Sequence, residues 1–168
     1  DNPDAIINVT DTSIARPASN SVLGFTLHQQ LGKHFLLKLT TAASVFTNDI
    51  NSSEVEATDK GVIKLIDAFN VNTSTQFHYA VDGSFGYTGN NFGIGAAYKR
   101  ISPDYKSMGV YFVTNDVEQY TLIPSVNLWK RKIRLGGSVG FEHDNLAANR
   151  SFQTERVIGS ANVSINPS

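Results

Sequence analysis

The sequence predicts an all-β fold, an antiparallel up-and-down transmembrane β-barrel with about 8 strands in this chain. Two observations lead there: apolar residues alternate with small or polar ones over segments of about 9–12 residues, and short and long connections alternate between these segments. The short connections are Gly32-Lys33-His34, Gly89-Asn90-Asn91 and Lys130-Arg131-Lys132. The long connections are 47–68, 101–116 and 144–155. Outer-membrane barrels have short turns at one end and long loops at the other.

The composition fits a single β-barrel domain over 1–168 and excludes several classes of protein. Charged residues make up only 17% of the chain and hydrophobic residues 40%, and there is no cysteine. Disulfides, thiolate metal sites and a cysteine nucleophile are therefore excluded. A net charge of −1 provides no basic footprint for nucleic acid. No apolar run reaches the roughly 18 residues of a membrane helix, a length that barrel strands do not need.

The strands are expected in the segments where the alternation is clearest. Residues 1–20 form an N-terminal extension or a weak first strand, for which the best segment is Ala5 to Thr10. The clear strands follow in chain order: Leu23 to Gln29, Phe35 to Val45, Phe77 to Tyr87, Phe92 to Lys99, Tyr120 to Leu128, Ile133 to Glu142, and Val157 to Ile165. Five of the seven have 9–11 residues, the length needed to cross a bilayer at a tilt.

The stretch 92–99 illustrates the alternation. One face holds Phe92, Ile94, Ala96 and Tyr98, whereas Gly93, Gly95, Ala97 and Lys99 occupy the other. Strict alternation of this kind predicts a strand that has one apolar and one polar face.

Two long loops carry further features. The loop 47–70 contains apolar residues with helix-like spacing after Thr58-Asp59, which predicts a short amphipathic helix or ordered segment on the outside of the barrel. In the loop 101–116, Pro103-Asp104 sets a turn. We expect Tyr105 and Met108 to be exposed there, and they are the candidates for contact with other envelope proteins.

Charged residues within the strands all fall on the polar faces. The residues expected to face the barrel lumen are His28, Lys38, His78, Asp82, Lys99, Arg134 and Glu142. A charge facing lipid at mid-bilayer would cost roughly 2–4 kcal/mol. Because both signs are present, structural pairing is a better interpretation than selectivity or catalysis.

A soluble, lipocalin-like barrel that binds a small apolar ligand has the same alternation with the faces reversed. Three features favour the membrane: the polar faces hold Gly, Ala, Ser and Thr instead of Lys and Glu, aromatic residues gather near strand ends, and the connections are asymmetric.

An outer-membrane hydrolase is a further alternative, but catalytic and cofactor signals are weak. Gly136-Gly137-Ser138-Val139-Gly140 matches the nucleophile elbow, yet it lies within a strand where the motif needs a strand–turn–helix. No Ser and His pair is expected on one lipid face. The four histidines lack metal-ligand spacing. We therefore expect no enzyme activity, no cofactor and no metal.

Three segments resemble outer-membrane barrel proteins of Bacteroidota. They are 98–112 (YKRISPDYKSMGVYF), 134–146 (RLGGSVGFEHDNL) and 156–168 (RVIGSANVSINPS). The resemblance implies a porin-like envelope component, associated with outer-membrane lipid and in some cases with secretion or surface display. Such barrels usually close with a strand that ends in an aromatic residue. This chain ends at Asn166-Pro167-Ser168, which predicts that it is part of a larger barrel.

Overall fold

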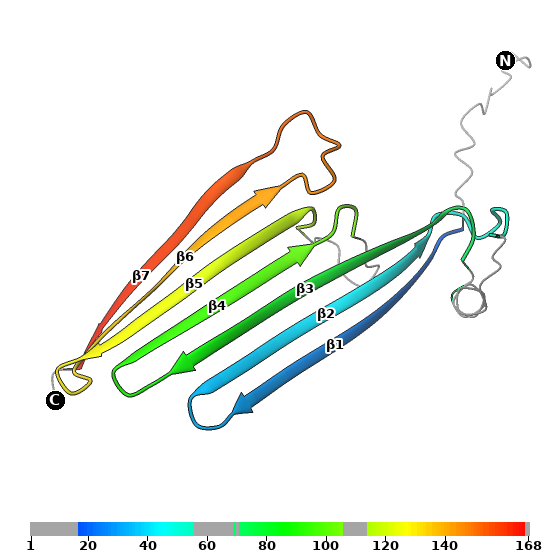
Figure 1. Cartoon of the computed structure of the whole chain (residues 1–168). Coiled ribbons are helices and arrows are strands. Elements are labelled where there is room, and N and C mark those ends of the chain that lie inside the picture. Colours follow the sequence, from blue (N-terminus) through cyan, green and yellow to red (C-terminus); the bar gives the residue numbers. More distant parts are fainter. Residues whose placement is uncertain (1–16, 56–68, 70, 106–113, 167–168) are drawn as a thin grey trace, which may run out of the picture. The chain divides into compact units, whose positions relative to one another are not determined.

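The computed structural model describes residues 17–55, 69, 71–105 and 114–166. Seven antiparallel strands form one sheet in which the order in space follows the order in the chain (Figure 1). They are β1 (Ser19–Leu31), β2 (Phe35–Thr47), β3 (Thr75–Thr88), β4 (Phe92–Ile101), β5 (Val117–Leu128), β6 (Ile133–Asp144) and β7 (Glu155–Ile165). The predicted all-β, up-and-down topology is confirmed, as are all seven clear strands.

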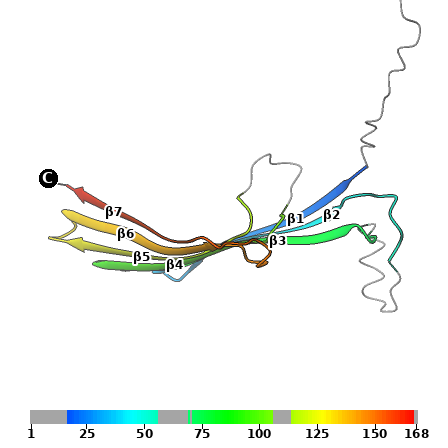
Figure 2. The same cartoon turned by 90° about the horizontal axis from the view of Figure 1, so that it is seen from above.

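The sheet is open. Strands β1 and β7 are its two edges, and the sheet twists between them, as viewed from above in Figure 2. The weak first strand at Ala5 to Thr10 lies outside the described residues. So does almost all of the predicted helix in the 47–70 loop, of which only Phe69 among the helix-spaced residues is described.

Tight turns join β1 to β2, β3 to β4 and β5 to β6. Gly32 has a φ of 65°, a conformation that glycine adopts without a steric penalty. At the next turn, the N–H of Gly89 donates to the carbonyl of Phe92 at 2.9 Å. We call the end of the sheet with these turns the turn end, and the opposite end the loop end.

The chain divides into two compact units. One comprises residues 1–19 and 47–75, and the other comprises 20–46 and 76–168, which includes most of the sheet. In the first unit, Asn72 donates from Nδ2 to the carbonyl of Asp49, and the Asn72 Oδ1 accepts from the N–H of Ser74, both at 2.9 Å. These bonds order the described part of the long β2–β3 connection.

Few apolar side chains are buried. Among the described residues, the buried hydrophobic side chains are Ile101, Tyr105 and Val117, against which Ala42 and Ala80 pack. A core of this size cannot account for the stability of a sheet of seven strands, because buried apolar area is the main favourable term in folding. The large apolar side chains must therefore be covered by something outside the described chain.

Candidate functional site

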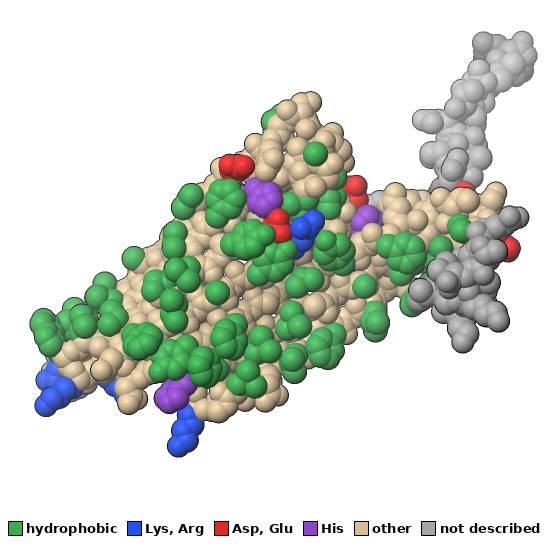
Figure 3. All heavy atoms as spheres, in the orientation of Figure 1, with side chains coloured by type: hydrophobic (Ala, Val, Ile, Leu, Met, Phe, Trp, Pro, Cys, Tyr) green, Lys and Arg blue, Asp and Glu red, His purple; other side chains and the backbone are tan. Residues whose placement is uncertain are grey.

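One face of the sheet, which we call the apolar face, exposes large hydrophobic side chains on every strand. Examples from four strands are Phe25, Phe85, Leu122 and Val139, which are 56%, 46%, 44% and 50% exposed. In Figure 3 hydrophobic side chains spread across the face in view, and charged side chains lie towards its two ends. A continuous apolar surface of this extent marks contact with a membrane or a partner.

Aromatic side chains bound this face at the turn end. The ring of Phe35 lies 5.6 Å from that of Phe85 and 5.2 Å from that of Tyr87, and Tyr87 lies 5.3 Å from Phe92. These four rings come from three neighbouring strands. Ring pairs at such distances are mutually favourable.

A second aromatic group bounds the same face at the loop end. The register places Tyr98 opposite Tyr120, and Tyr120 opposite Phe141. The rings of Tyr98 and Tyr120 are 5.1 Å apart. From Tyr120 to Leu128, β5 covers about 26 Å at ~3.3 Å per residue. A tilt of about 40° reduces this to roughly 20 Å, close to the apolar band of ~25 Å in outer-membrane barrels.

A charged row follows the aromatic row at the loop end of the apolar face. It runs across four paired strands through Arg100, Glu118, His143 and Glu155. Glu118 is the centre of this row, because its carboxylate accepts from Arg100 Nη1 at 3.1 Å and lies 3.1 Å from His143 Nε2. The hydroxyl of Tyr98 donates to the same carboxylate at 2.5 Å. Glu118 is only 7% exposed.

Of the three groups of a catalytic triad, the charged row contains at most two, a histidine and a carboxylate. His143 has a carboxylate neighbour in Glu118, as the histidine of a catalytic triad has. Its Nε2 faces Glu118, however, and its Nδ1 is buried without a hydrogen-bond partner. Neither ring nitrogen therefore meets a serine hydroxyl among the described residues, and the row has no nucleophile.

The opposite face, which we call the polar face, carries the seven residues expected to face the lumen. Three of them fall in one row, since the register places Asp82 opposite Lys99, Lys99 opposite Gln119 and Gln119 opposite Glu142. The row continues to Arg156 on β7, which donates from Nε to Glu142 at 2.6 Å. Glu142 is therefore paired, but its partner Arg156 is not one of the seven predicted residues.

The other four predicted residues lie away from this row. Lys38 and Arg134 line a hollow nearer the turn end, and the Nε2 of His78 is buried without a partner. His28 is on the edge strand β1. Whether all seven line a closed lumen stays a prediction, because the sheet is open.

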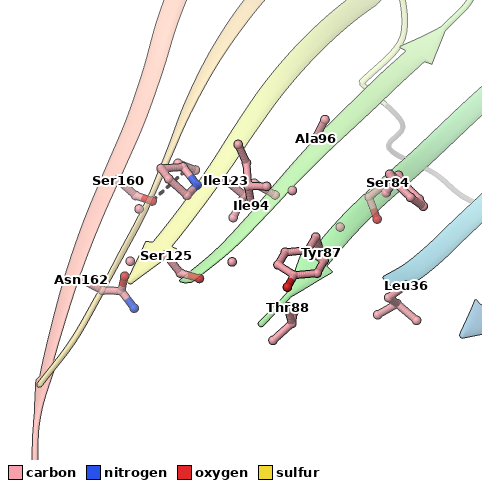
Figure 4. Close-up of a pocket in the computed structure, with 18 of the residues that line it drawn as sticks. Leu36, Ser84, Tyr87, Thr88, Ile94, Ala96, Ile123, Ser125, Ser160 and Asn162 are labelled. Carbon is pink, nitrogen blue, oxygen red and sulfur yellow. Dashed lines mark hydrogen bonds between the residues drawn. The ribbon is translucent and has the colours of Figure 1, made fainter. Parts of the chain in front are cut away.

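The hollow on the polar face has a volume of about 640 Å³ and a floor of small residues. Ser84, Ser125, Ser160 and Asn162 are among its lining residues and are labelled in Figure 4. The hydroxyls of Ser160 and Ser138 are hydrogen-bonded at 2.8 Å. A second hollow, of about 460 Å³, lies nearer the turns and is lined in part by Arg131, Lys132 and Arg134.

Glycines on the polar face leave space that neighbouring polar side chains occupy. Gly136 is opposite Asn162 in the β6–β7 register, and a Cβ at Gly136 would come within 2.5 Å of Asn162 Oδ1. A Cβ at Gly93 would likewise come within 2.7 Å of Ser125 Oγ. The polar side chains therefore lie flat over the glycines beside them, and larger residues at these glycines would displace them.

The expectation that Tyr105 is exposed is wrong. Tyr105 is 9% exposed and packs with Ile101 and Val117. These two residues share the polar face with Ala80 in the register, so the loop after β4 folds back over that face. The N–H of Tyr105 donates to the carbonyl of Ser102 at 3.3 Å. The other contact candidate, Met108, lies outside the described residues.

The loop end is also held by two acids, of which Asp116 is buried and Asp144 is partly exposed. Asp116, 2% exposed, pairs with Arg150 at 3.1 Å and accepts from the N–H of Leu146 at 2.8 Å. Asp144, at the end of β6, accepts from the N–H of Thr154 at 2.6 Å, and this hydrogen bond lowers the pKa of the Asp144 carboxyl. Both acids order the β6–β7 loop.

Sequence reasoning missed the charged row and Arg156, the ion-pair partner of Glu142. Arg156 was overlooked because the last strand was expected to begin one residue later, at Val157. Arg100, Glu118 and His143 share the parity of the apolar residues, so extending the alternation past Tyr98, Tyr120 and Phe141 would have put them on the apolar face. Their mutual contact depends on register, which alternation alone does not define.

Comparisons with protein-family models, curated proteins and solved structures found no match. Among the described residues, we find no helix with the length and hydropathy needed to span a bilayer. The same part of the chain contains no group of three or more His, Asp or Glu side chains placed to hold a metal ion.

Proposed function

We propose that this chain forms the wall of an integral β-barrel in the outer membrane of a Gram-negative bacterium. There it acts as a non-enzymatic structural, transport or docking component of the envelope. The observation that carries the proposal is the exposed apolar face, bounded by aromatic side chains at both ends. Lipid chains would cover the apolar band, and the aromatic rings would lie at the headgroup level.

Energetics support lipid as the cover of this face. Leaving one large apolar side chain in water instead of burying it costs roughly 1.5–3 kcal/mol. The exposed apolar side chains of the sheet far outnumber the three that are buried among the described residues. Surrounding lipid removes this cost for the whole face at once.

The polar face supports the same proposal. Small residues and hydroxyls form its floor, and Glu142 pairs with Arg156. An interior surface of a barrel has this character, whereas a face in bulk water usually carries many lysines and glutamates. Tyr105 would close part of the interior at the loop end.

Strand parity constrains how such a barrel closes. In an up-and-down sheet of seven strands, β1 and β7 run in the same direction. Pairing these two edges directly would give a parallel pair. A barrel with only antiparallel pairs therefore needs an odd number of further strands between β7 and β1.

A soluble barrel that binds an apolar ligand is the second candidate. Its support is a hollow of about 780 Å³ on the apolar face, lined by residues that include Leu39, Phe85, Leu122 and Val139. In that case the apolar face would be the interior and the glycine-rich face would meet water. The two candidates thus assign the same two faces to opposite environments.

Spin labels on neighbouring residues of β6 separate these candidates. The chain has no cysteine, so Val139→Cys and Ser138→Cys each give one label, on opposite faces. In phospholipid vesicles, we expect the label at 139 to collide with oxygen dissolved in the bilayer and not with a water-soluble nickel complex. A label at 139 that is shielded from both, in a protein that stays in solution without detergent, would overturn the membrane proposal.

The location of the loops can be tested in cells. Asn90→Cys lies in a turn and Ser151→Cys in the β6–β7 loop, and both positions are exposed. We expect a membrane-impermeant thiol reagent to label Ser151→Cys on intact cells and to reach Asn90→Cys only after lysis. The reverse order of labelling would contradict the orientation.

A further inference from the structure

The charges of the chain are segregated between the two ends of the sheet. The turns and the strand residues next to them contain five of the 14 Lys and Arg residues and none of the 15 Asp and Glu residues. These five are Lys33, Lys130, Arg131, Lys132 and Arg134. In Figure 3 the blue Lys and Arg side chains at this end have no red side chain beside them, whereas a further blue side chain nearer the loop end lies next to a red one. The turn end is therefore a purely basic edge in the described chain.

The turn between β5 and β6 presents an aromatic ring beside these charges. Trp129 follows the last residue of β5 and is 75% exposed. The turn has a defined shape, because the N–H of Lys132 donates to the carbonyl of Trp129 at 3.1 Å and Arg131 Nη2 donates to Asn90 Oδ1 at 3.0 Å. An exposed Trp beside basic side chains is suited to the interface between lipid chains and headgroups.

Among the basic side chains of the turn end, Lys130 is the one best placed to contact the lipid that would surround the barrel. Arg131, Lys132 and Arg134 line the smaller hollow on the polar face, but Trp129 and Lys130 do not. Lys130 and its neighbours Trp129 and Arg131 have positive φ angles, so the backbone changes direction sharply here. The exposed Lys130 thus lies next to the one tryptophan of the chain.

We propose that the turn end binds anionic phospholipid headgroups of the leaflet that it faces, with Trp129 in the interface and Lys130 beside the phosphates. This inference rests on the proposed membrane-embedded function. Its basis is charge complementarity, because no carboxylate of the described chain neutralises the turn end. At the loop end, by contrast, Arg100, Arg150 and Arg156 are each paired with a carboxylate.

Trp129 provides a local measurement, since it is the sole tryptophan. The full chain is reconstituted in vesicles of zwitterionic and anionic phospholipid in which one lipid or the other carries brominated acyl chains, which quench tryptophan fluorescence on contact. At low salt, we expect stronger quenching when the anionic lipid is brominated. The preference should be up to about fivefold, the usual attraction of one Lys or Arg to an anionic surface.

Matched variants test the charges themselves. Lys130→Gln should abolish the preference, whereas Lys130→Arg should keep it. Lys99→Gln removes the same charge from the polar face and should also leave the preference unchanged. Equal quenching by both lipids in the wild-type chain would overturn the headgroup proposal alone. Quenching by neither lipid would instead contradict insertion, and with it the proposed function.

Discussion

The two ends of the sheet use charge differently. At the loop end, acids are buried and paired: Glu118 with Arg100 and His143, Asp116 with Arg150, and Glu142 with Arg156. At the turn end, the charges are all basic and exposed, and the one described side-chain hydrogen bond from them joins Arg131 to the neutral Asn90. Charge therefore holds the strands and loops in place at one end, and remains available for ligands at the other.

The connections explain this difference. A tight turn defines the path of the chain by its backbone alone, as Gly32 and the left-handed residues at Trp129 to Arg131 do. Long loops have far more conformations to lose on folding, and side-chain contacts must compensate for that loss. Asp116 and Asn145 supply such contacts within the β6–β7 loop.

The largest expected effect is the loss of a charge at the loop end. Glu118→Gln keeps the shape of the side chain but leaves Arg100, whose Nε already lacks a partner, without its carboxylate. We expect the free energy of unfolding, measured by urea titration in vesicles, to fall by about 3 kcal/mol, the lower limit for breaking a buried ion pair.

Lys132→Gln is the matched change at the turn end. Its side chain is exposed, so the free energy of unfolding should change by less than about 0.5 kcal/mol. If Glu118→Gln and Lys132→Gln lowered the free energy of unfolding by similar amounts, charge pairing would not stabilise the loop end more than the turn end. That result would contradict the proposed difference between the two ends.

A smaller effect is expected where the loop after β4 covers the polar face. Tyr105→Ala removes a ring that packs on Ile101 and Val117, in a cluster that is smaller than a domain core. The expected cost is about 2 kcal/mol, below the range for aromatic residues in a full core. Phe152→Ala is the control, because Phe152 is 77% exposed in the neighbouring loop and should lose little. If both substitutions cost the same, the loop does not pack on this face.

The sequence predicts the strands and faces well because alternation is a local property. The faces of Phe92 to Lys99 follow directly from the residues, and the structure adds only two residues to that strand, Arg100 and Ile101. Contacts between strands depend on register, and register depends on the conformation of each connection. This is why the pairing of Glu118 with His143 could not be predicted. The burial of Tyr105 depends in the same way on the path of its loop.

A gain in stability, smaller in size than the loss expected for Tyr105→Ala, tests the turn end through its backbone. Trp129, Lys130 and Arg131 have φ angles of 49°, 55° and 69°, in the left-handed region that is unfavourable for residues with a Cβ. Lys130→Gly removes this penalty at the central position, where no described hydrogen bond involves the side chain. We expect a gain in the free energy of unfolding of about 1 kcal/mol, reduced by the larger entropy of glycine in the unfolded chain.

Glycine substitution should have the opposite sign in the middle of the neighbouring strand. Ser125→Gly on β5 is the control, because strand backbone gains nothing from glycine and loses about 0.5–1 kcal/mol. Both variants are compared with the wild type by urea titration in vesicles of zwitterionic lipid, where the charge of Lys130 has no anionic partner. A loss of stability in Lys130→Gly would mean that the turn is not strained at this residue. The turn end would then differ from the loop end in charge alone, and not in how its backbone fixes the connection.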